Sequence, residues 1–138
     1  MEQFYSKVKE GVLLHVIWRM EDFTEGRIDV ISPDQFIQCS ALLMNAGKTF
    51  RPHKHIEREV TDIDRIAQES WHIIKGRVKV TFYDLDDSII AQPILYEGDT
   101  SFTLRGGHTY LILQENTRVL EYKTGKYSGQ ATDKTFIV

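Results

Sequence analysis

ESWHIIKGRVKVTFYDLDD, residues 69–87, is the clearest strand–turn–strand pattern in the chain. Two runs rich in β-branched and aromatic side chains, 70–75 and 77–83, flank Gly76 and end at the acidic stretch 84–87. Glycine supplies the positive φ that a tight reversal needs, and aspartates cap turns. The pattern therefore predicts a β-hairpin.

The same alternation of short apolar runs and turn residues extends in both directions from this hairpin. It predicts further strands at 12–18, 27–31, 36–44, 48–55, 89–96, 101–104, 109–114 and 118–123. One segment, 56–68, instead spaces its apolar residues by three and four, and we interpret it as an inserted flap. About ten strands without a long helical pattern predict an antiparallel all-β sandwich or jelly roll.

Length and composition narrow the class of protein. With 138 residues and no linker or repeat, the chain 1–138 is expected to be a single domain, with N-terminal strands within 12–31. Its 17 basic and 20 acidic side chains, net charge −3, argue against a nucleic-acid surface. The lone Cys39 favours a reducing compartment, and 12–18 is too short to span a membrane. We therefore expect a cytoplasmic protein without membrane or nucleic-acid partners.

Three histidines and one carboxylate form a candidate metal site. Alternation in a strand places His53 and His55 on one face, while Glu69 begins one predicted strand and His108 opens another. Three imidazole nitrogens and one carboxylate oxygen suit a divalent first-row metal and leave one or two coordination positions for water or substrate.

The spacing of these residues resembles the cupin superfamily. Gly47, five residues, His53 and His55, then Glu69, six residues and Gly76 match its first motif, and Gly98, five residues, Leu104 to His108 approximate its second. The resemblance covers about 40–125 and implies a double-stranded β-helix, or jelly roll. It also implies a metal, Zn, Ni, Mn or Fe, held by His53, His55, Glu69 and His108. The spacer 56–68 holds thirteen residues, and Glu57 or Glu59 within it is the alternative carboxylate.

The C-terminal residues narrow the resemblance further. LEYKTGKY at 120–127 and DKTF at 133–136 look like the ending of small bacterial cupins associated with lipopolysaccharide and other surface-polysaccharide biosynthesis. This implies a sugar or sugar-nucleotide ligand, an isomerase or epimerase if the protein is an enzyme, and a homodimer in which the strand 12–18 covers a neighbour's sheet edge.

Four side chains are candidates for contacting that ligand. Trp71 shares the face of Glu69 and Tyr110 shares the face of His108, so both aromatic rings can line the pocket or fill the core. Arg51 and Arg105 could each clamp an anionic group.

Three alternatives to a metal-dependent isomerase stay open, and the remaining candidate side chains are interpreted as structural. The alternatives are a metal-free enzyme with a histidine base and Tyr110 as acid, a non-catalytic sugar-binding or scaffolding module, and a metal-dependent oxygenase. The structural interpretation applies to His15, His72 and Cys39.

Overall fold

The computed structural model describes residues 1–32, 34–43, 45–46, 48, 66–124 and 135–137. These residues form β1 (Glu2–Tyr5), β2 (Leu13–Trp18), the 3-10 turn η1 (Met20–Asp22), β3 (Gly26–Asp29), β4 (Ser40–Leu43), β5 (Glu69–Lys75), β6 (Val78–Tyr83), β7 (Ile89–Ala91), β8 (Ile94–Leu95), β9 (Thr100–Thr103), β10 (Gly107–Ile112) and β11 (Arg118–Lys123).

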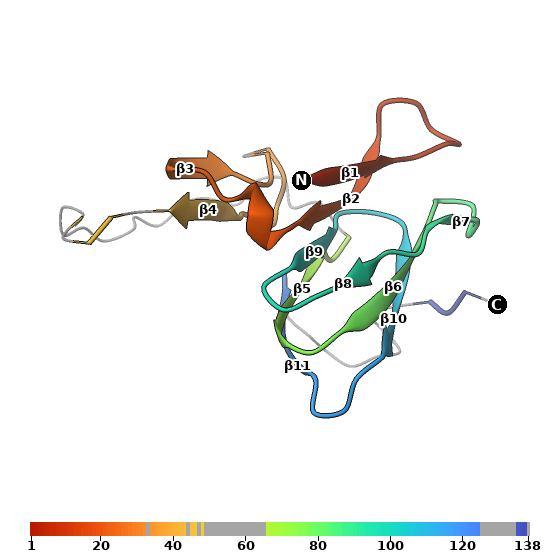
Figure 1. Ribbon diagram of the computed structural model, residues 1–138. Coiled ribbons are helices and arrows are strands. Elements are labelled where there is room, and N and C mark those ends of the chain that lie inside the picture. Colours follow the sequence, from red (N-terminus) through yellow and green to blue (C-terminus); the bar gives the residue numbers. More distant parts are fainter. Residues whose placement is uncertain (33, 44, 47, 49–65, 125–134, 138) are drawn as a thin grey trace.

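The strands form antiparallel sheets, as the all-β prediction requires. One sheet has the order β1-β2-β9-β5-β11, a second joins β10, β6 and β7 with β8 beside β6, and β3 pairs with β4. Every named strand pair is antiparallel. Figure 1 shows the β5 and β9 side of the molecule opposite β6 and β10, and the β3–β4 hairpin apart from both.

Two apolar clusters lie on opposite faces of the five-stranded sheet. The inner cluster joins Ile17 and Ile73 of this sheet to Val78, Val80 and Phe82 of β6. The outer cluster consists of Val16, Trp18, Val30, Ile31, Ile37, Ala41, Phe102 and Leu104. Successive strand residues point to opposite faces, so β2 is buried on both sides. Val30, Ile31, Ile37 and Ala41 thus cover part of one face of the sheet, and the other face borders the space between the sheets.

The predicted hairpin at 69–87 is present. Gly76 has φ +99°, and a Cβ there would lie 2.3 Å from the side-chain oxygen of Thr117. Only glycine combines that backbone angle with so close a neighbour. The reversal between β5 and β6 therefore depends on Gly76.

Several predicted strand boundaries differ from the structure. The predicted strand 36–44 is reduced to β4, and 89–96 is divided into β7 and β8 with Pro93 between them. Proline has no N–H to donate to a ladder, which accounts for the interruption. β1 was not predicted. Residues 49–55 of the predicted strand 48–55 and residues 56–65 of the flap 56–68 lie outside the described residues. No helix in the described ranges is long and apolar enough to cross a membrane.

Candidate functional site

Strand register aligns polar side chains in two rows on the inner face of the five-stranded sheet. The pairings β2–β9, β9–β5 and β5–β11 set His15, Thr103, Glu69 and Lys123 opposite one another in the first row. The second row, by the same pairings, is Ile17, Ser101, Trp71 and Glu121. β10 of the facing sheet supplies His108 and Tyr110, which the register places beside Phe82 and Val80 of β6.

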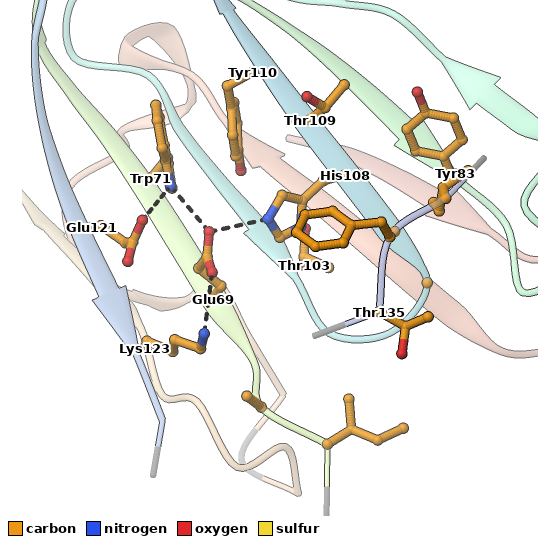
Figure 2. A pocket seen from close by; sticks show the side chains of 16 residues that line it. Glu69, Trp71, Tyr83, Thr103, His108, Thr109, Tyr110, Glu121, Lys123 and Thr135 are labelled. Carbon is orange, nitrogen blue, oxygen red and sulfur yellow. Dashed lines mark hydrogen bonds and ion pairs between the residues drawn. The ribbon is translucent and has the colours of Figure 1, made fainter. Parts of the chain in front are cut away.

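Glu69 is the centre of the polar contacts. His108 Nε2 lies 3.1 Å from Glu69 Oε1, so the two sheets meet at this pair. Trp71 donates its indole N–H to Glu69 Oε1 at 3.1 Å and also to Glu121 Oε2 at 3.1 Å. Lys123 Nζ lies 3.9 Å from Glu69 Oε2. Figure 2 shows these side chains converging from β5, β10 and β11.

These neighbours keep Glu69 ionised. Burial by itself would raise the pKa of the Glu69 carboxyl, since its side chain is only 10% exposed. The hydrogen bond and charge of His108, with the charge of Lys123 and the Trp71 N–H, outweigh burial and lower the pKa below its usual range. A carboxylate that stays charged while nearly buried can accept a metal ion or a hydrogen-bond donor.

The two aromatic side chains stack on each other. The Trp71 and Tyr110 ring centroids are 3.9 Å apart with an interplanar angle of 6°. The Tyr110 hydroxyl lies 3.1 Å from Ser101 Oγ. Burial raises the pKa of Tyr110, and the nearby carboxylates of Glu69 and Glu121 raise it further, so the phenol is neutral. Since each ring covers one face of the other, only the outer face of each can contact a ligand.

An open cavity of about 760 Å³ lies beside these side chains. Members of both rows, the first part of β10 and residues near the C-terminus line it. The lining comprises Ile66, Ala67, Glu69, Trp71, Tyr83, Thr103, Gly106, Gly107, His108, Thr109, Tyr110, Glu121, Lys123, Thr135, Phe136 and Ile137. This volume falls in the range of small-molecule sites. Aromatic rings beside convergent carboxylate, imidazole and ammonium groups suit a polar organic ligand.

The 3.1 Å between Glu69 Oε1 and His108 Nε2 is an ordinary hydrogen-bond distance, and it is also a separation that two ligands of one metal ion can have. Two ligands about 2.1 Å from one ion and at a right angle to each other are about 3.0 Å apart. The Glu69 Oε1 to His108 Nε2 separation of 3.1 Å matches this value. No group of three or more metal-binding side chains occurs among the residues that the structure describes. His108 Nδ1 is buried and has no hydrogen-bond partner in that same part of the chain.

The structure brings together four of the predicted site residues. Glu69, His108, Trp71 and Tyr110 all line the cavity. Arg105 is half-buried at the turn before β10, and it is not among the described residues of the lining. Five further predicted residues lie outside the described ranges: Arg51, His53, His55, Glu57 and Glu59.

The positions of His15, His72 and Cys39 agree with their interpretation as structural residues. His72 Nδ1 is 2.8 Å from Thr100 Oγ1, on the face of β5 opposite Glu69. His15 is completely buried in β2. Cys39 is half-buried, and burial raises the pKa of its thiol, as expected for an unreactive side chain.

Several polar residues of the cavity lining were not identified from the sequence, among them Thr103, Glu121 and Lys123. Alternation within 118–123 places Glu121 and Lys123 on one face, which is a usable signal. These two residues can be assigned to the site only when the register between β11 and β5 is known. That register contains an irregularity between Arg118 and Val119. Nothing in the sequence indicates that irregularity.

Comparisons with models of protein families, with curated proteins and with solved structures found no significant match to this chain.

Proposed function

We propose that this protein is a metal-binding cupin that acts on, or recognises, a sugar or sugar-nucleotide intermediate of surface-polysaccharide biosynthesis. The observation that carries the proposal is the 3.1 Å contact between Glu69 and His108 on facing sheets. These residues come from the two separate motifs that resemble the cupin superfamily. Their meeting beside a cavity is what a double-stranded β-helix with that ligand set requires.

His53 and His55 complete the proposed metal site, and Glu69 and His108 contribute one oxygen and one nitrogen. β10 has a strand neighbour, β6, on one side within the described part of the sheet. Zn, Ni, Mn or Fe suits three imidazoles and a carboxylate.

The proposed reaction, if the protein is an enzyme, is isomerisation or epimerisation of a sugar. A bound divalent metal would polarise a carbonyl and so ease removal of the neighbouring proton. Trp71 orients the Glu69 carboxylate through its N–H, and the Trp71–Tyr110 stack forms one wall for a sugar ring. The cavity is large enough for a hexose with part of a nucleotide.

A metal-free isomerase is the second candidate, and the same contact favours it. A carboxylate bonded to an imidazole orients the ring and raises its basicity, as a histidine base requires. In that alternative Glu69 orients His108 as the base, and Tyr110 is the candidate acid. The non-catalytic sugar-binding module and the metal-dependent oxygenase use the same residues and are distinguished by the experiments below.

Metal analysis tests the proposed centre. Protein purified without an affinity tag is analysed for Zn, Ni, Mn and Fe, alongside Glu69→Gln, His108→Ala and the control His72→Ala. We expect about one equivalent in the wild type and in His72→Ala, and at least about tenfold less in the site variants. If the wild type contains no metal as purified and binds none when metal is added, the metal-free alternative is supported. Full occupancy in His108→Ala contradicts the proposed ligand set.

Turnover separates the enzyme from the binding module. A panel of nucleotide-linked ketosugars is incubated with the protein in deuterated water, and products are followed by mass spectrometry and proton exchange. Exchange that depends on Glu69 and His108 supports isomerisation. Binding without exchange or product supports the module, and consumption of dioxygen supports the oxygenase.

A further inference from the structure

The segment 135–137 contributes all three of its residues to the cavity lining. It belongs to no strand, so no sheet register holds it in place. Figure 2 shows Thr135 on the side of His108 away from Trp71. The segment therefore adds a wall to the site that the strands do not supply.

The contact that fixes this segment is made at Gly107, the first residue of β10. A Cβ on Gly107 would lie 2.5 Å from Cδ1 of Ile137 and 3.3 Å from Cβ of Tyr83, which is its cross-strand neighbour on β6. The Ile137 methyl group thus occupies the space that a side chain at position 107 would take. A glycine inside a strand often marks such a close approach.

The two glycines before His108 are present for different physical reasons. Gly106 has φ +76°, and a Cβ there would lie 2.4 Å from the backbone oxygen of Tyr83, so the turn itself requires glycine. Gly107 is not among the glycines with positive φ, and its backbone angles are open to any residue. The space taken by Ile137 is what distinguishes position 107.

Phe136 is held at the cavity with its ring uncovered. Its side chain is 70% exposed, the highest value among the large hydrophobic side chains in the described ranges. It lines the same cavity as the charged groups of Glu69 and Lys123. Sugar hydroxyls match those charged groups, whereas a phenyl ring is matched by a flat ring that stacks on it and removes apolar surface from water. A nucleobase is such a ring.

We infer that Gly107 and Ile137 fix the segment 135–137 as a wall of the site, and that Phe136 on this wall stacks on the nucleobase of a nucleotide-linked ligand. The choice of ligand rests on the proposed function, which places the sugar part at Glu69. The docking of Ile137 does not depend on it. The ligand class is therefore a sugar nucleotide and not a free sugar.

The docking is tested in ligand-free protein labelled with ¹³C at the isoleucine δ methyl groups, with Ile137→Val for assignment. We expect a nuclear Overhauser contact between the Ile137 δ methyl and the Gly107 α protons. Gly107→Ala should shift the Ile137 signal without unfolding the protein, because the atom that must move is the end of a flexible side chain. A wild type without this contact overturns the docking of the segment.

The nucleobase subsite is tested by calorimetry with uridine, thymidine, guanosine and cytidine diphosphates. We expect the wild type to bind at least one of them and Phe136→Ala to bind it roughly five- to hundredfold more weakly. Gly107→Ala should also weaken binding, and it should add no further loss in the Ile137→Ala background. The control is Phe36→Ala, since Phe36 is an exposed phenylalanine that is not among the described residues of the lining.

Equal affinity in Phe136→Ala and wild type, or a wild type that binds none of the four nucleotides, overturns the subsite. A further loss from Gly107→Ala in the Ile137→Ala background shows that Gly107 does not act through Ile137. None of these measurements involves metal or turnover. If the wild type binds a nucleotide through Phe136 but contains no metal, the proposed metal centre fails and the wall at 135–137 stands.

Discussion

Trp71 and Trp18 differ in what their indole N–H groups meet, which allows a matched test. The Trp71 N–H bridges Glu69 and Glu121, whereas Trp18 Nε1 is buried without a partner among the described residues. Trp71→Phe keeps an aromatic ring against Tyr110 but removes the donor. We expect the pKa of Glu69 to rise and the hydrogen-bond contribution to folding, about 1 kcal/mol, to be lost.

Carbon-13 titration of the labelled Glu69 carboxyl, with Glu69→Gln for assignment, measures this pKa in metal-free protein. Trp18→Phe removes the same atoms from the opposite face of the sheet and should leave the pKa of Glu69 unchanged. An unchanged value in Trp71→Phe as well shows that the indole does not hold the carboxylate.

His15 should make the protein less stable in mild acid. Burial lowers its pKa from 6.5 to about 4, so between these values the unfolded chain binds more protons than the folded one. Stability therefore falls as the pH is lowered through this window, by on the order of 3 kcal/mol from this group. Urea unfolding at closely spaced pH values should show a steeper loss in the wild type than in His15→Phe. Parallel curves between pH 6.5 and 4 contradict the assignment.

For single residues, the sequence predicts which face of a strand a side chain occupies, but not which side chain of the facing sheet it contacts. Alternation correctly paired Glu69 with Trp71 and His108 with Tyr110, and motif spacing anticipated that Glu69 and His108 would meet. The stacking of Trp71 on Tyr110 depends on how two sheets are set against each other. No pattern within either strand carries that information.

β2 is an element with no solvent-facing side. Val16 packs in the outer cluster and Ile17 in the inner one, and both are fully buried. Ile17→Ala should cost about 2–5 kcal/mol and Val16→Ala roughly 2 kcal/mol, because each leaves a cavity in a different layer. On β11, Leu120 is 46% exposed, so Leu120→Ala should cost less than about 0.5 kcal/mol.

Urea unfolding of the three variants measures these costs. A small effect for Val16→Ala beside a large one for Ile17→Ala means that the outer cluster does not stabilise the sheet. The position of β2 also bears on the predicted homodimer. β1 and β9 occupy both edges of β2 within the chain, so β2 is not available to cover a neighbour's sheet edge. The dimer itself stays a prediction.

Strand existence was more predictable than strand length. The run 118–123 coincides with β11, because its alternation is uninterrupted. In the run 36–44, Ile37 gives its backbone N–H to the buried amide oxygen of Gln68. That hydrogen bond replaces a ladder partner, and it joins segments that sequence reasoning had no cause to connect. β1 was missed because four mostly exposed residues carry little pattern of their own.

The described part of the molecule has two main sheets, and the space between them divides into an apolar part and a polar part. The apolar part contains Ile17, Ile73 and Phe82. The polar part contains Glu69, His108 and Lys123. Across the polar part the described links between the sheets are the Glu69–His108 contact, the Ser101–Tyr110 hydrogen bond and the Trp71–Tyr110 stack. A metal ion held by Glu69 and His108 would therefore join two sheets and not merely two side chains.

Removal of such a metal should lower the thermal stability of the entire protein. A ligand that binds only the folded state at one hundred times its Kd stabilises it by about 2.7 kcal/mol, or roughly 10 °C in Tm for a chain of this size. We expect chelator-treated wild type to melt lower by this amount and to recover when the metal identified by elemental analysis is returned. Glu69→Gln combined with His108→Ala should melt at the same temperature with and without metal, whereas the control His72→Ala should respond as the wild type does. If neither chelator nor added metal changes the Tm of the wild type, no metal joins its two sheets. The Glu69–His108 contact is then a hydrogen-bonded pair.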